Sequence, residues 1–300
     1  VTCLVREKSN LGLLPKQQIR LVFGDLNSHE AMRKAANGVN IVYHVAGAIK
    51  ASKKEEYFQI NKIGTRNLLK AVAEVNPKLE RFIYVSSLAA AGPSRAGWKL
   101  TEAAEPNPVS WYGKSKLEGE KEVLHYAGKL PVTIVRPSAV YGPGDKETLV
   151  VFRMARRGLF FFPSHTPRRF SLIHVKDLVE GIIMAGERDT HSGEIYFLSR
   201  PEIYTWDDVG REIAALLGKP FRRISFPKWL VEAAGVAGDL YAWITNRPTT
   251  INSQKLKEFL EPSWLCDSSK AEKHLGFCPM IDLKTGILDT LHWYQQEGWL

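Results

Sequence analysis

A tyrosine and a lysine stand four residues apart in the stretch SWYGKSKLEGE, which covers residues 110–120. On a helix, residues at this spacing lie on one face, so Tyr112 and Lys116 can reach the same site. A phenol has a reference pKa of about 10 and is a weak base at neutral pH, but a nearby ammonium favours its ionised form. The pair is therefore suited to moving a proton on or off an alcohol or carbonyl oxygen.

The spacing alone also fits a solvated helix surface, so the neighbouring residues must decide between the two interpretations. An apolar run upstream, RFIYVSS, ends in Ser86 and Ser87. A hydroxyl at the carboxyl end of a strand faces the ligand crevice of an open α/β sheet. There it can hydrogen-bond a substrate oxygen and share its developing charge. The residues alone leave this role open to either Ser86 or Ser87.

The elements that must position these groups alternate along the first half of the chain, as is typical of βαβ units with a parallel sheet. Apolar β-rich runs predict strands at 2–5, 19–23, 40–46, 81–86 and 132–137. Helical patterns between them predict helices near 28–37, 55–75 and 110–128. The sequence therefore predicts an α/β domain over residues 1–145.

Beyond residue 145 the pattern changes to short strands mixed with helices. We interpret 147–170 as a helix followed by a basic loop, and 171–186 as a strand and helix that return to the first sheet. Further helices are predicted near 205–217, 227–245, 269–275 and 282–297, with short strands in EIYFLS (194–199) and RRISF (222–226). We expect residues 146–300 to form a smaller mixed α/β region that binds the substrate.

Several ordered motifs accompany the tyrosine and the lysine. They are NIVYHVAGA (40–48), NKIGTRNLLKA (61–71), RFIYVSS (81–87), VRPSAVYGPGD (135–145), IHVKDL (173–178) and CDSSKAEKHLGFCPMIDLKTGI (266–287). Together they resemble the extended short-chain dehydrogenase/reductase superfamily, which includes NAD-dependent epimerases and dehydratases and 3β-hydroxysteroid dehydrogenases. The resemblance covers nearly the whole chain. It implies a Rossmann-like doubly wound parallel sheet that binds NAD(P).

The resemblance also implies roles for individual positions. Tyr112 would exchange the proton, and Lys116 would lower the pKa of Tyr112 and hold the nicotinamide ribose. Ser87 would polarise the substrate oxygen, with Ser86 as the alternative if the register differs by one residue. The expected cofactor contacts are Arg6, Asp25 and Leu26 near the adenosine, Ala46 and Gly47 beneath the cofactor, and Pro137 beside the nicotinamide. Asn61 is either a support for the active-site helix or a residue of the helix start without catalytic duty. No metal is expected.

A dinucleotide-binding unit normally begins with a strand, a glycine-rich turn and a helix whose N-terminus receives the pyrophosphate. Here the chain opens at VTCLVRE, which we interpret as the second strand, and no glycine fingerprint follows. Either ~30 residues of a longer protein precede Val1, which we favour, or this form lacks the pyrophosphate cradle. Arg6 stands where an acidic residue would favour NAD, so we expect NADP, with NAD as the alternative.

The substrate is less well defined by the sequence. Ser87-Leu88-Ala89 stands where dehydrating relatives carry Thr-Asp-Glu, so a 4,6-dehydratase is not expected. Phe170 occupies the position of an arginine that binds the diphosphate in sugar-nucleotide relatives. With an aromatic-rich second half, this favours oxidation or reduction of a steroid-, flavonoid- or lipid-like alcohol or ketone. The alternatives are a nucleotide-sugar epimerase and, given the absent glycine turn, a catalytically silent cofactor-binding scaffold.

Composition sets wider limits. The net charge is +9, yet the basic residues are scattered and no nucleic-acid motif accompanies them. The three cysteines, Cys3, Cys266 and Cys278, lack metal-ligand spacing and suit a reducing cytoplasm. No apolar run could span a bilayer, and the stretch 229–245 predicts either a packed amphipathic helix or one that lies on a membrane surface. We expect a small-molecule substrate, no nucleic-acid partner and a cytoplasmic homodimer.

Overall fold

A computed structural model gives the structure of the chain, and it describes residues 1–12, 14, 18–95, 97–163, 167–245, 249 and 252–300. Its main sheet is parallel and follows the order β3 (Ile41–His44), β4 (Arg81–Val85), β5 (Val132–Pro137) and β9 (Glu194–Leu198). The chain is thus an α/β protein of the Rossmann-like class, as the sequence predicted.

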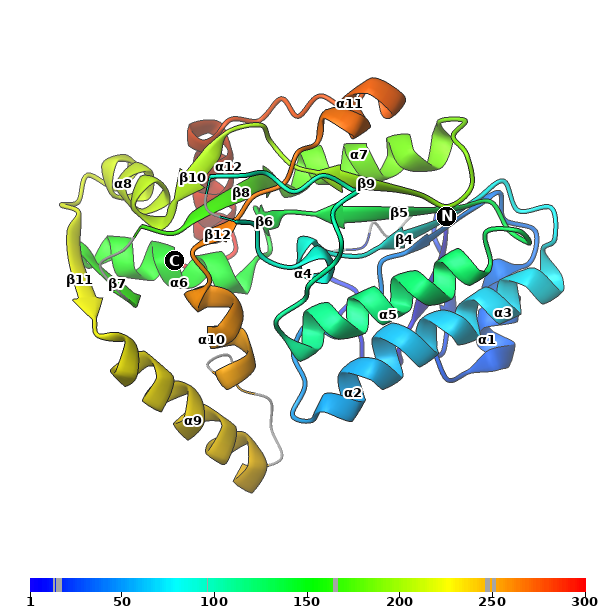
Figure 1. Ribbon diagram of the computed structural model, residues 1–300, viewed down its shortest axis with the longest axis horizontal. Helices are drawn as coiled ribbons and strands as arrows, with labels where there is room; N and C mark the ends of the chain where they lie inside the picture. The colour runs from blue at the N-terminus through cyan, green and yellow to red at the C-terminus, as the bar shows by residue number, and fades with distance from the viewer. Residues whose placement is uncertain (13, 15–17, 96, 164–166, 246–248, 250–251) are drawn as a thin grey trace.

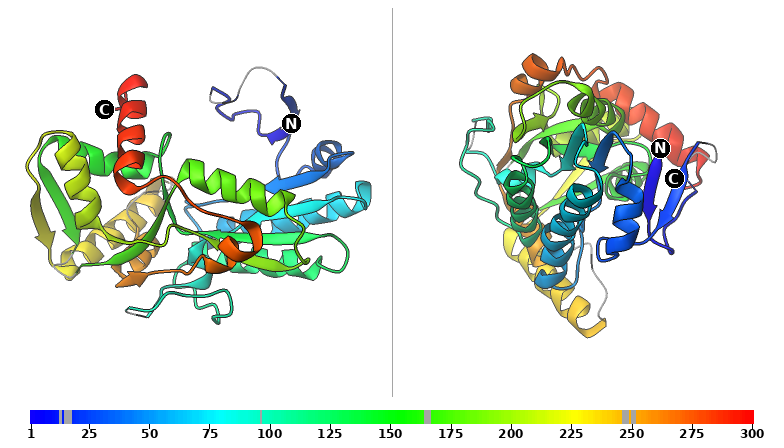
Figure 2. Two further views of the ribbon diagram at one scale, coloured as in Figure 1. Left: turned by 90° about the horizontal axis from the view of Figure 1, so that it is seen from above. Right: turned by 90° about the vertical axis from the view of Figure 1, so that its right-hand side faces the viewer.

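The first two strands stand apart from that sheet. β1 (Thr2–Val5) and β2 (Arg20–Phe23) pair with each other in parallel and with no other described strand. In a doubly wound sheet one more strand would lie between β1 and β3. Figure 2 shows the N-terminal pair beside the rest of the molecule.

Alternation along the strands explains why helices cover both faces of the main sheet (Figure 1). Phe82 and Tyr84 point to the face covered by α1 (His29–Ala36), α3 (Thr65–Val75) and α5 (Trp111–His125). Ile83 and Val135 point to the opposite face, where α7 (Val175–Glu187) and α11 (Ser269–Leu275) pack.

The helix predicted over 55–75 is one helical run with an unusual middle. It consists of α2 (Lys54–Phe58), a π-helical segment η1 (Gln59–Gly64), and α3. Such π segments widen a helix locally and often mark functional sites. Asn61 lies inside this segment and is almost fully buried.

The second half contains a four-stranded sheet and a two-stranded one. The sheet joins β6 (Ala139–Tyr141), β10 (Ile203–Thr205) and β12 (Ser263–Trp264) to a central strand β8 (Arg169–His174). A separate parallel pair joins β7 (Leu159–Pro163) to β11 (Arg222–Phe226). Helices α6 (Lys146–Arg156), α8 (Trp206–Leu216), α9 (Lys228–Thr245), α10 (Ser253–Leu260) and α12 (Leu283–Gln296) surround them.

The structure differs from the predictions for this half at two places. The strand within 171–186 does not return to the main sheet, because β8 pairs with β6, β10 and β12, and only the following helix α7 covers that sheet. The segment 147–170 was predicted to be a helix followed by a loop, but it also contains the strand β7. Its aromatic side chains Phe160 and Phe162 enter the core beside Phe221 and Arg223.

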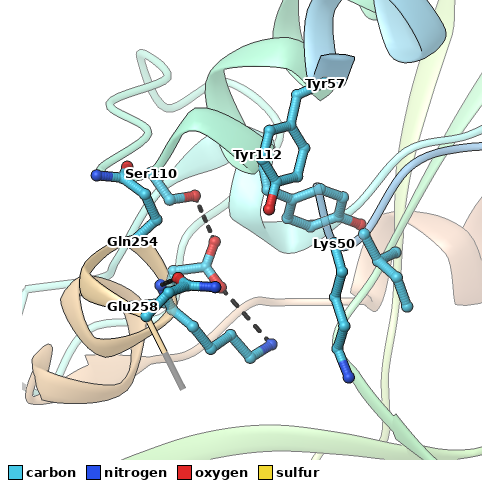
Figure 3. A pocket seen from close by; sticks show the side chains of 9 residues that line it. Lys50, Tyr57, Ser110, Tyr112, Gln254 and Glu258 are labelled. Atoms are coloured by element: carbon cyan, nitrogen blue, oxygen red, sulfur yellow. Dashed lines mark hydrogen bonds and ion pairs between the residues drawn. The ribbon is translucent and has the colours of Figure 1, made fainter. Parts of the chain in front are cut away.

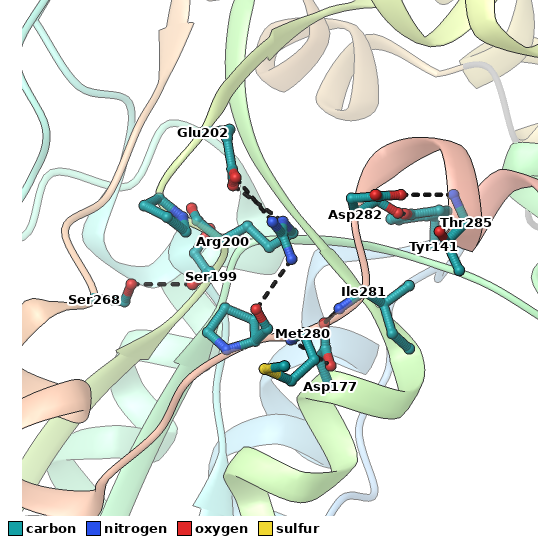
Figure 4. Close-up of polar contacts among 12 residues, drawn as sticks. Tyr141, Asp177, Ser199, Arg200, Glu202, Ser268, Met280, Ile281, Asp282 and Thr285 are labelled. Atoms are coloured by element: carbon teal, nitrogen blue, oxygen red, sulfur yellow. Dashed lines mark hydrogen bonds and ion pairs between the residues drawn. The ribbon is translucent and has the colours of Figure 1, made fainter.

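The motif IHVKDL fastens the C-terminal segment to the sheet domain (Figure 4). The Asp177 carboxylate, at the start of α7, accepts hydrogen bonds from the backbone N–H groups of Met280 (3.1 Å) and Ile281 (2.9 Å). Arg200 donates to the carbonyl of Pro279 (3.0 Å). This aspartate therefore has a structural duty that needs no contact with substrate.

Candidate active site

Helix α5 carries both the tyrosine and the lysine. Ser110 begins it, with a side chain that accepts a hydrogen bond from the N–H of Gly113 (3.0 Å). The glycines in GKSKLEGE permit close packing, because a Cβ at Gly113 would overlap the Ala89 carbonyl. A Cβ at Gly119 would overlap the Tyr84 hydroxyl. The helix thus lies close to the strand end that carries the two serines.

Ser87, and not Ser86, is the serine that faces the tyrosine. The Ser87 side chain lies close enough to the Tyr112 phenol to lower its pKa, and the Ser87 hydroxyl accepts the N–H of Ala89 (3.1 Å) at the start of the short helix α4 (Leu88–Ala91). Ser86 turns the other way and donates to the Glu120 carboxylate (2.5 Å).

Lys116 reaches the same strand end from one turn further along α5. Its ammonium donates to the Val85 carbonyl (2.6 Å) and lies 4.4 Å from the centroid of the Tyr84 ring. The side chain is buried, and burial lowers its pKa to about 7. Glu120 opposes this shift but does not outweigh it.

The pKa of the phenol differs from the sequence-based expectation. Burial raises the pKa of Tyr112 to about 12, whereas Lys116 was expected to lower it. The Ser87 hydrogen bond lowers it, while the carboxylates of Glu258 and Glu147 raise it further. Desolvation outweighs the single hydrogen bond, so Tyr112 is protonated at neutral pH in this state.

Asn61 ties the loop after β3 to the active-site helix. Its amide oxygen accepts the N–H of Ala48 (2.8 Å), and its amide nitrogen donates to the Ala48 carbonyl (3.0 Å) and the Ser115 hydroxyl (2.8 Å). With both ends of the amide hydrogen-bonded, Asn61 acts as a support for α5.

The strand register places three of the expected contacts at one level. Tyr84 is paired with His44 on one side, and Val85 with Val135 on the other. Extending these parallel registers puts Gly47, Ser87 and Pro137 in one row at the carboxyl edge of the sheet. A parallel sheet binds its ligands at this edge.

Gly47 leaves open the space next to the lysine, which is the observation that fits a cofactor here. A Cβ at Gly47 would lie 3.5 Å from Lys116 Nζ and 3.0 Å from the Asn61 amide oxygen. Ala46 and Gly47 are both exposed. A dinucleotide can therefore approach the backbone closely at this point.

The expected adenosine contacts lie at the ends of β1 and β2. Asp25 accepts hydrogen bonds from the N–H of Asn27 (2.9 Å) and the Ser28 hydroxyl (3.1 Å), and these hold its pKa below the usual range. Leu26 offers its carbonyl to Asn67 (3.0 Å), which fixes this loop against α3. Arg6 is exposed just beyond β1.

A buried ion pair behind the site was not predicted from the sequence. Arg136 on β5 donates two hydrogen bonds to Glu120 on α5 (2.9 and 2.6 Å), and both side chains are 2% exposed. This bidentate pair joins α5 to strand β5 of the main sheet.

Helix α10 covers the tyrosine from the second half of the chain (Figure 3). Glu258 accepts a hydrogen bond from the Ser110 hydroxyl, and Gln254 accepts the N–H of Trp111 (3.2 Å). A pocket there is lined by Ile49, Lys50, Tyr57, Ser110, Tyr112, Asn252, Gln254, Lys255 and Glu258. Burial raises the pKa of Glu258, whose carboxylate lies close enough to affect Tyr112.

Ionic contacts hold this cover in place. Glu147, near the start of α6, pairs with Lys50 (3.0 Å) from the loop after β3 and with Lys255 (3.4 Å) on α10. Within the described part of the chain, no cluster of three or more histidine, cysteine, aspartate or glutamate side chains could hold a metal ion.

The chain is similar to known proteins over most of its length. A sequence model of the NAD dependent epimerase/dehydratase family matches residues 1–198. The chain is 32% identical to a ceramide reductase of Caulobacter vibrioides over 94% of this chain and 83% of that protein. It is 27% identical to a UDP-glucose 4-epimerase of Vibrio cholerae over 92% of this chain and 83% of that one.

The similarity to a solved structure extends over the whole fold. The crystal structure of gox2253 superposes with a TM-score of 0.79 at 26% identity, over 98% of this chain and 90% of that one. The family match covers the sheet, the serine, the tyrosine and the lysine described above. The chain therefore belongs to the NAD-dependent epimerase/dehydratase family, whose members are enzymes of the extended short-chain dehydrogenase/reductase type.

Proposed function

We propose that the protein interconverts a secondary alcohol and a ketone in a steroid-, flavonoid- or lipid-like substrate, with NAD(P) as the cofactor. The observation that carries this proposal is the meeting of Ser87, Tyr112 and Lys116 at the carboxyl end of β4. This meeting also speaks against a silent scaffold, which needs no such arrangement.

Each group has a distinct role in the proposed reaction. The nicotinamide supplies or accepts the hydride. In the reductive direction Tyr112 gives its proton to the carbonyl oxygen as that oxygen gains charge, and Ser87 donates a hydrogen bond to the same oxygen. A phenol with a pKa of about 12 is protonated at neutral pH, and an alkoxide is a stronger base than a phenolate. Lys116 then stabilises the phenolate.

We expect the residues that hold the cofactor to lie at the carboxyl ends of the parallel strands. Lys116 and the backbone of Ala46 and Gly47 would contact the nicotinamide half, with Pro137 beside it. Asp25 and Leu26 would meet the adenine. The exposed Arg6 favours NADP, because a guanidinium can bind the 2′-phosphate with two hydrogen bonds.

Two observations support an apolar substrate. Phe170 is buried and packs on Trp206 (ring centroids 4.8 Å apart), so no cation for a diphosphate stands at this position of β8. The chain's 32% identical relative is named for ceramide, a lipid.

A nucleotide-sugar epimerase is the second candidate, and the pocket lining favours it. Lys50, Gln254 and Lys255 are polar groups that could hold a sugar or a diphosphate beside Tyr112. The relative from Vibrio cholerae is named for this activity. An epimerase would use the same proton transfer and return the hydride to the opposite face.

The deciding experiment compares substrates and one substitution. The protein is assayed for oxidation of NADPH and NADH with long-chain ketones and 3-ketosteroids, and for epimerisation of UDP-glucose. We expect ketone-dependent NADPH oxidation that Tyr112→Phe lowers by about 10²–10⁴-fold, while NADPH fluorescence on binding stays unchanged. Tyr126→Phe, at the far end of α5, is the control.

Turnover of the UDP-sugar alone would establish the epimerase. A Tyr112→Phe variant as active as wild type would contradict both candidates, since each depends on this proton.

A further inference from the structure

Helix α9 presents an uncovered apolar face. At 100° per residue, an arc about 160° wide contains only apolar or aromatic residues: Trp229, Leu230, Ala233, Ala234, Val236, Ala237, Leu240, Tyr241 and Ile244. All are exposed, with exposed fractions of 67% for Trp229, 64% for Val236 and 67% for Ile244. We call these residues the α9 face.

The opposite side of α9 is the side that packs on the protein. Gly235 lies so close to α10 that a Cβ there would overlap Leu256, and Ala242 is buried. The Asp239 carboxylate accepts the N–H of Ser253 (3.2 Å) at the start of α10. The α9 face therefore points away from α10.

Four cations gather where the β7–β11 pair begins. Arg156, Arg157, Lys219 and Arg222 are exposed, and we call them the basic cluster. The N–H of Arg222 donates to the Gly158 carbonyl (3.2 Å), which brings the two segments together. None of the four forms an ion pair with another described residue.

The basic cluster and the α9 face belong to one border of the molecule. β11 runs from the cluster directly into α9, and Figure 1 shows both elements along the same edge. Between them, Phe161 (39% exposed) and Ile224 (37% exposed) are register partners on neighbouring strands. Exposed apolar side chains therefore also stand on the two strands between the cluster and α9.

We propose that this border docks the protein on an anionic lipid bilayer, with α9 lying in the plane of the interface. The α9 face would enter the boundary between headgroups and acyl chains, while the basic cluster meets lipid phosphates. Trp229 and Tyr241 stand near the two ends of this face, and such rings prefer the headgroup level. A second copy of the chain would cover the apolar face but leave four cations without counter-charges.

Interfacial docking also agrees with the length and composition of the helix. No helix in the described ranges is both long and apolar enough to cross a membrane. Since α10 joins α9 to the pocket beside Tyr112, docking would bring the cover of that pocket close to the lipid surface. The proposal itself needs no particular substrate, because the surface is defined without reference to the site.

The test is co-sedimentation of the full chain with vesicles of phosphatidylcholine alone or mixed with phosphatidylglycerol, at low and high salt. We expect binding to the mixed vesicles that salt weakens. Replacing Arg156, Arg157 and Arg222 by glutamine should weaken it by about fivefold per residue. Val236→Glu with Ile244→Glu should weaken it at least about tenfold.

A matched pair of tryptophans provides the control. Trp229→Glu should lower vesicle binding, whereas Trp98→Glu, at a similarly exposed site (75%) outside the border, should leave it unchanged. Thermal unfolding without vesicles checks that each variant is folded. If the Val236→Glu, Ile244→Glu variant does not fold, Trp229→Glu tests the α9 face in its place.

Three results would overturn the proposal. They are no binding of wild type to the mixed vesicles, equal losses for the two tryptophan variants, and a dimer in light scattering that Val236→Glu with Ile244→Glu dissociates. The last would assign the α9 face to contacts between copies of the chain. Because none of these measurements uses turnover, a failed catalytic assay would leave them unaffected.

Discussion

The substitution Lys116→Met replaces a buried ammonium with an apolar side chain of similar length. Lys116 is 3% exposed, and its pKa is about 7 in the folded protein against 10.5 for an ordinary lysine. The folded state therefore binds this proton far more weakly than the unfolded chain. The substitution should abolish the proposed reaction and, without cofactor, make the protein more stable.

The magnitude follows from the two pKa values. A difference between 10.5 and about 7 corresponds to roughly 4 kcal/mol against folding at pH 7. Methionine removes this term but leaves the Val85 carbonyl without its donor, which costs about 1–3 kcal/mol. The net gain in unfolding free energy at pH 7 should be about 2 kcal/mol.

The same pKa values give the direction of the pH dependence. As pH falls from 10.5 to about 7, the unfolded chain binds a proton at this lysine and the folded protein does not. The lysine therefore destabilises the wild type progressively over this range, and by a constant amount below it. The methionine variant lacks this contribution, so its advantage over wild type should shrink as pH rises.

Urea unfolding without cofactor, at neutral and at alkaline pH, measures both effects. Lys114→Met is the matched control, because Lys114 is exposed on the same helix and should change stability little at either pH. A Lys116→Met protein less stable than wild type at pH 7, or a stability difference that does not vary with pH, would refute the reasoning.

Three further substitutions test the surroundings of the site, each by denaturant unfolding. Gly119→Ala should destabilise the protein by about 1–3 kcal/mol, since its Cβ would overlap neighbouring side-chain and backbone oxygens. Gly128→Ala, with open space around it, should not. Arg136→Met should cost about 3–5 kcal/mol because it strands the buried Glu120 charge, and adding Glu120→Met should recover much of that loss. Glu258→Gln should raise stability increasingly above pH 4.5, because burial raises the pKa of Glu258 and ionising it in the folded state is unfavourable.

The parts of the site predictable from the sequence are those whose residues are close along the chain. Tyr112 and Lys116 share one helix by their spacing, and Ser87 ends a strand recognisable by its apolar run. The resemblance already favoured Ser87 over Ser86, but only the structure shows which of the two faces Tyr112, because adjacent strand residues point to opposite faces and the apolar run does not say which face is which.

The remaining parts depend on contacts between distant segments. Glu258 meets Ser110 across 148 positions of sequence, and no local pattern distinguishes it from other charged residues of α10. Strand β8 reads as an ordinary apolar strand, and only its pairing with β6, β10 and β12 excludes it from the main sheet. Propensity and periodicity predict that a strand exists, but its neighbours are decided by tertiary packing.

The two pKa shifts at the centre of the site have one physical origin and a consequence for the proposed reaction. Burial disfavours both the phenolate and the ammonium, so near pH 7 Tyr112 is neutral and about half of Lys116 is neutral as well. In the proposed reduction, the proton that Tyr112 gives up creates a negative charge beside Lys116, which raises the affinity of the lysine for a proton. In the half of the molecules whose Lys116 is neutral, the lysine would take up a proton from solvent as the alcohol forms, so that phenolate and ammonium become an ion pair at that stage. A group that stabilises charge only when charge develops lowers the barrier without first binding the substrate more tightly. On this reasoning the low pKa of Lys116 favours catalysis. The same burial that lowers this pKa makes the lysine destabilise the protein when no cofactor is bound.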